Sequence, residues 1–204
     1  MLDSILKLIV ADNVLHSKWL NTLSYMENAG AKKISASEHK ENVNIIILKH
    51  AAEEHRHAYY LKKQISKLDD SLCKTYSNAE LLSPKHTKYY LHALDIAVCR
   101  YIKAEFNLSG YGLKFAAYLF VTYAIEVRAD ELYPIYQNIL DETRSKVNVK
   151  SIILEEEGHL QEMINQLVSF SDNWENHAAE VIKIEKAMFD NWVSALKAEL
   201  PITA

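Results

Sequence analysis

The sequence predicts an all-α fold, and three observations support this prediction. Apolar residues recur at helical spacing along almost the whole chain. The alternation of apolar and polar residues that is typical of strands is scarce. The chain of 204 residues contains only 4 glycines and 3 prolines, which suits long helices and argues against a turn-rich β fold.

The length and composition are those of an ordinary globular protein with a single domain. We expect one domain over 1–204, with a helical core over about 3–170 and a tail helix over about 172–199. Hydrophobic residues make up 49% of the chain and charged residues 25%. The net charge of −4 is spread without a basic stripe, so a nucleic-acid partner is not expected. The apolar run over 115–125 is too short to span a membrane, so no membrane partner is expected either.

The two cysteines and the first residues of the chain bear on its location. Cys73 and Cys99 form no CxxC motif and no disulfide-rich pattern, which indicates a reduced, cytoplasmic protein. The N-terminal segment has an acidic third residue and no small-residue cleavage site, so we do not interpret it as a signal peptide.

The helical pattern is interrupted at five places. We expect helices over about 3–33, 43–68, 84–107, 112–140, 147–170 and 172–199. Asn42 or Asn44 would cap the second helix, although Ser35 with Glu38 offers an earlier capping box. Ser83-Pro84 has the cap-then-proline pattern of a helix start.

The lengths of the connections predict how these helices pack. A short link follows the first helix and the fourth, whereas a long connection that includes the third helix separates the two pairs. The sixth helix, capped by Ser171-Asp172, follows as a tail. This order suits a four-helix bundle with one long crossover that contains an extra helix.

One acidic-histidine motif occurs twice. Glu54 and His57 are three residues apart, and Glu156 and His159 repeat that spacing. Side chains at this spacing share one helix face and can reach a single ion. Roughly one ExxH string is expected by chance in such a chain, so the motif alone is weak. The alternative is that both segments are solvated helix faces.

A lone glutamate inside an apolar stripe precedes each of the two motifs. Glu27 lies beside Leu23 and Met26, and Glu126 lies within TYAIEV. Each glutamate precedes its ExxH string by about 30 residues, so at about 1.5 Å per residue two antiparallel helices would bring both to one level. For Glu27 the alternative is an exposed helix end.

Four inward carboxylates and two imidazoles would then meet inside the bundle. Ionised carboxylates are costly to bury without partners, and four close together repel one another. Two divalent cations would balance the four charges, with two glutamates bridging the ions and one histidine on each. Oxygen and nitrogen ligands of this kind suit iron or manganese, and zinc is a further alternative.

The sequence resembles the ferritin-like di-iron-carboxylate superfamily, which includes rubrerythrins, bacterioferritins, ribonucleotide reductase small subunits and bacterial monooxygenase hydroxylases. The resemblance covers about residues 10–168 and is carried by Glu27, Glu54-x-x-His57, Glu126 and Glu156-x-x-His159. It implies a ferritin-like bundle that holds two metal ions, with iron as the preferred metal. It also implies that Glu53 orients His159 and Glu155 orients His57. The chain has no CxxC pair, so the rubredoxin module of rubrerythrins is missing.

Two residues near Glu126 are further candidates for the site. Tyr123, one turn before Glu126, is a candidate catalytic tyrosine, with a core tyrosine as the alternative. Asp130, one turn after Glu126, would either orient a metal ligand without binding the metal itself, or pair with Arg128 or with a neighbouring helix. His50, one turn before Glu54, is interpreted as an interior or surface histidine.

The resemblance implies a di-iron oxidoreductase or oxygenase that uses O₂ or peroxide on a small-molecule substrate. An external electron donor is expected, because the chain has no flavin or iron–sulfur motif. One alternative is an iron- or manganese-binding protein with a ferroxidase or detoxification role. Another is a non-catalytic helical interaction protein. The sequence leaves open whether the chain forms a homodimer.

Overall fold

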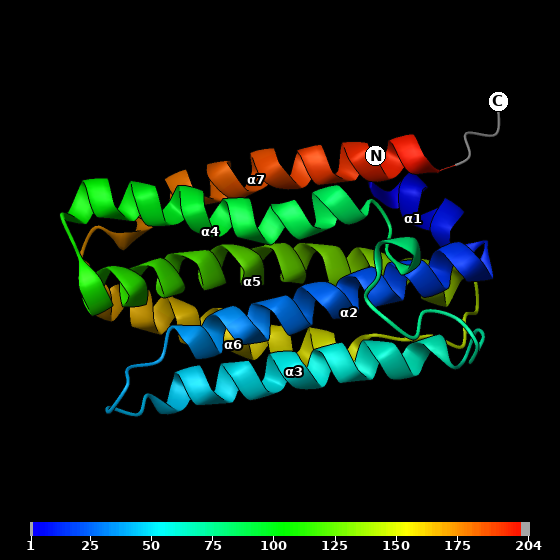
Figure 1. Ribbon diagram of the computed structural model, residues 1–204, viewed down its shortest axis with the longest axis horizontal. Coiled ribbons are helices and arrows are strands. Elements are labelled where there is room, and N and C mark those ends of the chain that lie inside the picture. The colour runs from blue at the N-terminus through cyan, green and yellow to red at the C-terminus, as the bar shows by residue number, and fades with distance from the viewer. Residues whose placement is uncertain (1, 201–204) are drawn as a thin grey trace.

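The computed structural model describes residues 2–200, which form a bundle of α-helices without a β-strand in this range (Figure 1). The prediction of an all-α fold is therefore confirmed. The helices are α1 (Leu2–Val10), α2 (Asn13–Ala36), α3 (Ile45–Ile65), α4 (Pro84–Phe106), α5 (Gly110–Glu142), α6 (Lys150–Phe170) and α7 (Trp174–Glu199). A single 3₁₀ turn, η1 (Asn78–Glu80), lies between α3 and α4.

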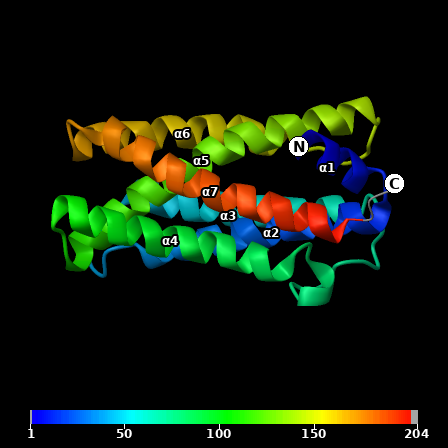
Figure 2. The ribbon, with the colours of Figure 1, turned by 90° about the horizontal axis from the view of Figure 1, so that it is seen from above.

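Two antiparallel helix pairs form the centre of the molecule. The helix α2 packs along α3, and α5 packs along α6 (Figure 1). The helices α4 and α7 pack against each other and both contact α5, and α4 also contacts α2. Seen from above, α7 runs obliquely across the molecule (Figure 2).

The predicted first helix is in fact two helices. The first helix ends at Val10. The carboxylate of Asp12 then accepts hydrogen bonds from the backbone N–H groups of Val14 and Leu15, at 2.8 and 2.9 Å. Asp12 is thus the N-cap of α2, because its side chain satisfies backbone donors that have no partner within the helix. The break lets the short helix α1 pack against α5 and α7.

The other predicted helix starts are close to the observed ones, but not all caps are correct. Asn44 caps α3, so the alternatives with Asn42 and with Ser35 are wrong, and Ser35 lies inside α2. Ser83 precedes Pro84 at the start of α4 as expected, but its side chain makes no capping bond. Its hydroxyl instead lies 3.2 Å from Nδ1 of His86.

The start of α7 also differs from the prediction. Asn173, and not Ser171-Asp172, occupies the N-cap position, and it makes no side-chain capping bond. The hydroxyl of Ser171 instead accepts the backbone N–H of Asn173 at 3.3 Å within the preceding turn.

Two clusters of buried apolar side chains lie at the two ends of the central helices. On α5, Leu132 belongs to the first cluster and Ala124 to the second. On α3, Leu61 belongs to the first cluster and Ala51 to the second. All six candidate ligands occupy the sequence positions between the two clusters on their helices. The fold therefore surrounds one polar layer with apolar packing on both sides.

Two further findings concern the described residues as a whole. No helix among residues 2–200 is both long enough and apolar enough to cross a membrane. Cys73 and Cys99 are both free thiols.

Candidate metal centre

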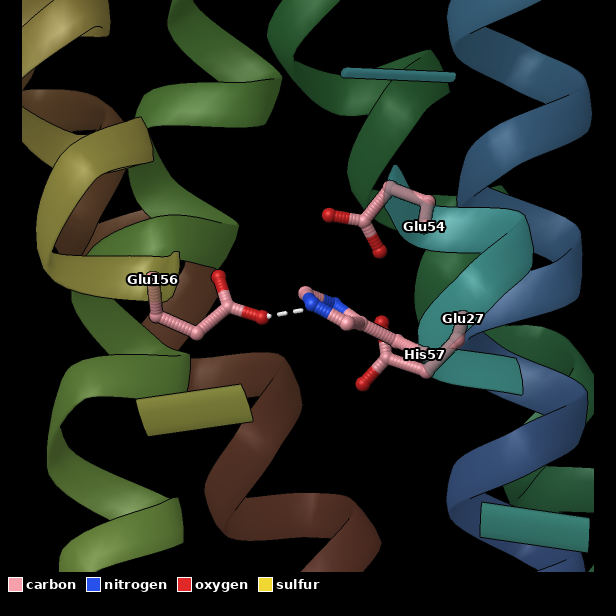
Figure 3. Close-up of side chains that lie close together, drawn as sticks. All are labelled: Glu27, Glu54, His57 and Glu156. Carbon is pink, nitrogen blue, oxygen red and sulfur yellow. Dashed lines mark ion pairs between the residues drawn. The ribbon is translucent and has the colours of Figure 1, made fainter. Parts of the chain in front are cut away.

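The six candidate ligands meet in two overlapping groups of four. The first group is Glu27, Glu54, His57 and Glu156, and the second is Glu54, Glu126, Glu156 and His159. Within each group, one ligand atom from every residue lies within 4.8 Å of those of the other three. Figure 3 shows the first group, with Glu54 and His57 reaching from α3 toward Glu156 on α6.

The ExxH motifs lie on the buried stripes of their helices. On α3, Glu54 is 6% exposed and His57 is fully buried. On α6, Glu156 and His159 are 2% and 1% exposed. The alternative that these segments are solvated helix faces is therefore wrong. Four positions that would ordinarily hold apolar side chains hold titratable groups instead.

Each histidine is oriented by an acidic residue from the opposite helix. Nε2 of His57 lies 3.1 Å from Oε2 of Glu155, and Nε2 of His159 lies 2.8 Å from Oε2 of Glu53. This is the cross-pairing that the resemblance implies. A carboxylate that accepts the Nε2–H of an imidazole leaves the Nδ1 lone pair free, and here both Nδ1 atoms face the cluster of carboxylates.

A cation on α3 lies beside each of the two orienting carboxylates. Glu155 accepts a hydrogen bond from the guanidinium of Arg56. Glu53 lies 4.0 Å from the amine of Lys49. These contacts limit where the two carboxylates can lie, and so help to fix the orientation of the imidazoles.

Three ligand atoms inside the cluster lack a hydrogen-bond partner. They are the Nδ1 atoms of His57 and His159 and the Oε2 atom of Glu126. Nδ1 of His57 faces Oε1 of Glu156 at 3.0 Å. Two acceptor atoms at this distance repel unless a proton or a cation lies between them, and buried polar atoms without a partner are costly. The donor set therefore fits bound cations.

The carboxylates of the centre differ in their affinity for protons. Burial raises the pKa of Glu54 well above its usual value, and the nearby carboxylate of Glu27 raises it further. Burial also raises the pKa of Glu126, and the charge of Glu156 adds to the effect. Burial opposes ionisation of Glu156 as well, but its close contacts with the imidazoles of His159 and His57 outweigh burial and lower the pKa of Glu156.

The histidines respond in the opposite direction. Burial disfavours the charged form of His159, but its contacts with Glu126 and Glu156 outweigh this effect and raise its pKa to about 11. The pKa of His57 is also raised, because its contact with Glu156 and the charge of Glu27 outweigh burial. Protons thus neutralise the cluster when no cation is bound, and a bound cation would displace them.

A tyrosine that the sequence analysis missed contacts the centre. The hydroxyl of Tyr133 on α5 donates a hydrogen bond to Oε1 of Glu27. Burial, and then the charge of Glu27, raises the pKa of Tyr133 well above its usual value, so the hydroxyl stays protonated. Tyr133 lies seven residues after Glu126, which is two helical turns on the same face. This spacing was the available signal.

The two further candidates near Glu126 lie elsewhere. The ring of Tyr123 packs edge-on against Trp174 of α7 at 5.8 Å between centroids, and among residues 2–200 it has no hydrogen bond to a candidate ligand. Asp130 is exposed. Arg128 does not pair with Asp130, because its guanidinium binds the carboxylates of Glu131 and Glu185 instead.

His50 packs against the centre without joining either group of ligands. It is fully buried, and its ring centroid lies 4.8 Å from that of His159. Its Nε2 lies 2.9 Å from Oε2 of Glu162, and its Nδ1 lies 3.2 Å from the hydroxyl of Tyr118. Burial, and then the charge of His159, lowers the pKa of His50. His50 is therefore an interior histidine, which is one of the two places that the sequence analysis left open.

A cavity adjoins the centre on the side of three carboxylates. Its volume is about 510 Å³, and helices α2, α4, α5 and α7 form its wall. Glu27, Glu54 and Glu126 reach this wall, whereas neither His57 nor His159 does. A molecule in the cavity would therefore approach the centre from its carboxylate face.

Comparisons with known proteins give no relative of this chain. No family model matches it, and neither the curated proteins nor the solved structures contain a significant match. The function of the protein is therefore inferred from the geometry of the centre.

Proposed function

We propose that this protein is a dinuclear metal-carboxylate oxidoreductase that uses two iron ions and O₂ or peroxide to oxidise a small molecule. The main support for this proposal is that Glu54 and Glu156 belong to both groups of ligands. Shared carboxylates can bridge two ions. Each ion would then also be held by one lone glutamate and one histidine, which are Glu27 with His57 and Glu126 with His159.

Charge and ligand chemistry support two divalent cations. Four carboxylates balance two such ions, and this balance removes most of the repulsion within the buried cluster. Carboxylate oxygens with imidazole nitrogens suit iron, with manganese and zinc as alternatives. The unpartnered atoms of His57, His159 and Glu126 all lie in the ligand groups, where a cation would satisfy them.

We further propose that α2, α3, α5 and α6 are the four core helices of a ferritin-like bundle. In this assignment α4 is the extra helix of the crossover and α7 is the tail. The ligand positions support it, because α2 and α5 each supply a lone glutamate and α3 and α6 each supply an ExxH motif.

The chain's own residues would prepare the centre for chemistry. Iron(II) ions in such a site supply the reduction of O₂ or peroxide that drives the oxidation of an organic molecule. Glu53 and Glu155 hold the histidine rings with Nδ1 toward the ligand groups. Tyr133 fixes the carboxylate of Glu27 by its hydrogen bond. The apolar clusters on both sides help to keep water from the ligands other than Glu27, which is partly exposed.

An external electron donor is part of the proposal, because the sequence has no flavin or iron–sulfur motif.

The cavity favours substrate oxidation over metal handling alone. A ferroxidase needs access for ions, whereas an apolar space beside the carboxylates suits an organic molecule.

The test is to load the protein with iron(II) without air, measure its metal content, and then record its absorption spectrum on exposure to O₂. We expect two irons per chain and an absorption band that depends on O₂. Less than one ion per chain, with no spectral change on exposure to O₂, would overturn the proposal.

A further inference from the structure

The cavity beside the centre indicates the class of substrate. We propose that it binds a linear aliphatic molecule with an anionic head group, as in a fatty acid, whose chain lies along α5 and passes the carboxylates of the centre. The binding of this molecule rests on the cavity, and its role as a substrate rests on the proposed function.

The wall of the cavity is long in one direction. On α5 it includes a stripe at helical spacing, formed by Leu113, Ala117, Val121, Ile125, Ala129 and Leu132. These residues share one helix face, and at about 1.5 Å per residue the stripe is about 30 Å long. The cavity volume of about 510 Å³ is ordinary for a small-molecule site. An ordinary volume spread over such a length suits a linear molecule better than a compact one.

The side chains that face this stripe are mainly apolar. The helix α2 contributes Leu23, Met26 and Ile34, and α7 contributes Phe189 and Trp192. A wall of this kind favours an aliphatic chain, because burial of the chain removes apolar surface from water. It offers few hydrogen-bond partners to a sugar, a nucleotide or a peptide.

The metal ligands interrupt the apolar wall part of the way along its length. Glu126 lies on α5 between Val121 and Ala129 of the stripe, and Glu27 and Glu54 reach the wall from α2 and α3. A chain that follows α5 therefore brings methylene carbons next to the centre. This position is where an oxidising centre would act on an aliphatic substrate.

One end of the cavity has a positive charge. Lys33, near the end of α2, and Lys114, near the start of α5, both line the wall. Lys33 pairs with Asp95 at 2.8 Å, whereas Lys114 makes no ion pair within residues 2–200. Arg128 also lines the cavity, but its charge is matched by the buried carboxylate of Glu185. The anionic head group is therefore placed at Lys114, about 18 Å along α5 from Glu126.

Gly30 on α2 allows a direct test of the chain's position. It lines the cavity, and a Cβ atom built on it meets no atom within 4 Å. Gly30→Leu would therefore place a side chain in the cavity, with room for its Cβ atom. Gly158 on α6 is the matched control, since it is also helical with open space around a Cβ, but it is exposed and does not line the cavity.

The experiment measures the binding of dodecanoate, a probe for the part of the cavity between Lys114 and the centre, by isothermal titration calorimetry on the protein as purified and under nitrogen. We expect Gly30→Leu to weaken binding by about tenfold or more, because a leucine displaces the equivalent of two methylene groups of the chain. Gly158→Leu should bind like the wild type. Equal affinity in the wild type and in Gly30→Leu, or no binding to the wild type, would overturn the proposal.

A second pair of variants tests the head group. Lys114→Gln should weaken the binding of dodecanoate by about threefold or more and leave that of dodecanol unchanged, because only the carboxylate interacts with the amine. Lys103→Gln on α4 is the control, since Lys103 is exposed and lies outside the wall. Equal effects of Lys114→Gln on both ligands would overturn the assignment of the head group.

Iron content separates this inference from the proposed function. The Gly30→Leu variant should bind as much iron as the wild type, because Gly30 is not a candidate ligand. Dodecanoate binding that depends on Gly30, in a protein that binds no iron, would contradict the proposed function and support the aliphatic site. Full iron binding without any dodecanoate binding would support the centre and contradict the aliphatic site.

Discussion

The two helix pairs supply equivalent ligands but hold their lone glutamates differently. Glu27, in the α2–α3 pair, is partly exposed, and its carboxylate accepts a hydrogen bond from Tyr133. Glu126, in the α5–α6 pair, is 2% exposed and has an oxygen without a partner. Residues that look alike in the sequence thus have different electrostatic environments.

This difference indicates that the two metal positions are not equivalent. A cation beside Glu126 would replace a missing partner in a dry environment, where charge pairs interact strongly. A cation beside Glu27 would compete with the hydroxyl of Tyr133 and with water. We therefore expect the ion held by Glu126 and His159 to bind more tightly than the ion held by Glu27 and His57.

The largest expected effect is at Glu54 and Glu156, the two residues that both groups of ligands share. Glu54→Ala or Glu156→Ala should lose most of the bound metal, because each removes a carboxylate from both groups of ligands. The measurement is the metal content of purified, iron-loaded protein. Glu157→Ala is the control, since Glu157 is exposed on the same helix as Glu156. Full metal content in both ligand variants would show that the two groups do not share these residues.

Variants of the lone glutamates test whether the two metal positions differ in affinity. Glu126→Gln should remove the tighter phase of a metal titration, whereas Glu27→Gln should remove the weaker phase and leave about one ion per chain bound. Calorimetric titration with manganese(II), which avoids oxidation by air, distinguishes the two phases. If both variants weakened binding to the same extent, the two positions would be equivalent despite their different surroundings.

The orienting carboxylates should have a smaller effect. Glu53→Gln and Glu155→Gln each remove a charge that fixes a ligating imidazole, and such changes lower metal affinity by about 10- to 100-fold. Competition with a chelator measures this change, with Glu157→Gln as the control. An unchanged affinity in both variants would mean that the contacts of the histidine Nε2 atoms do not influence the centre.

The smallest expected effect concerns stability at His16, where the two pairs meet away from the metal ligands. His16 on α2 is 1% exposed, and its Nε2 lies 2.6 Å from the hydroxyl of Tyr136 on α5. Burial lowers the pKa of His16 from 6.5 to about 4. The unfolded chain therefore binds a proton that the folded protein does not bind between these pH values, and stability falls as the pH falls through this range.

His16→Gln removes this pH dependence. Between about pH 7 and pH 5, the free energy of unfolding of the wild type should fall by about 2 kcal/mol more than that of the variant. Urea unfolding at the two pH values measures the difference. A parallel decrease in both proteins would show that His16 does not take up a proton on unfolding.

The ligand positions could be predicted from the sequence because they depend on local geometry. The spacing within each ExxH motif fixes a shared helix face, whatever the packing around it. The apolar neighbours of Glu126 indicated that its face is buried, and the structure confirms that burial. Glu53 and Glu155 followed from the resemblance, and their contacts with the opposite histidines are present.

Features that depend on packing between distant helices could not be predicted in this way. The break before α2 depends on the packing of α1 against α5 and α7 as well as on the cap at Asp12, because an aspartate also occurs within helices. Tyr133 was one of 12 tyrosines, and its contact with Glu27 depends on how α5 faces α2. The cavity arises where four helices fail to fill the space between them, which no single helix reveals.

The most direct test of the centre is the anomalous scattering of iron in crystals of the loaded protein. Our account predicts two peaks about 3.5–4 Å apart. Both peaks should contact the carboxylates of Glu54 and Glu156, with His57 on one ion and His159 on the other. One peak alone, or peaks outside these ligands, would contradict the dinuclear centre.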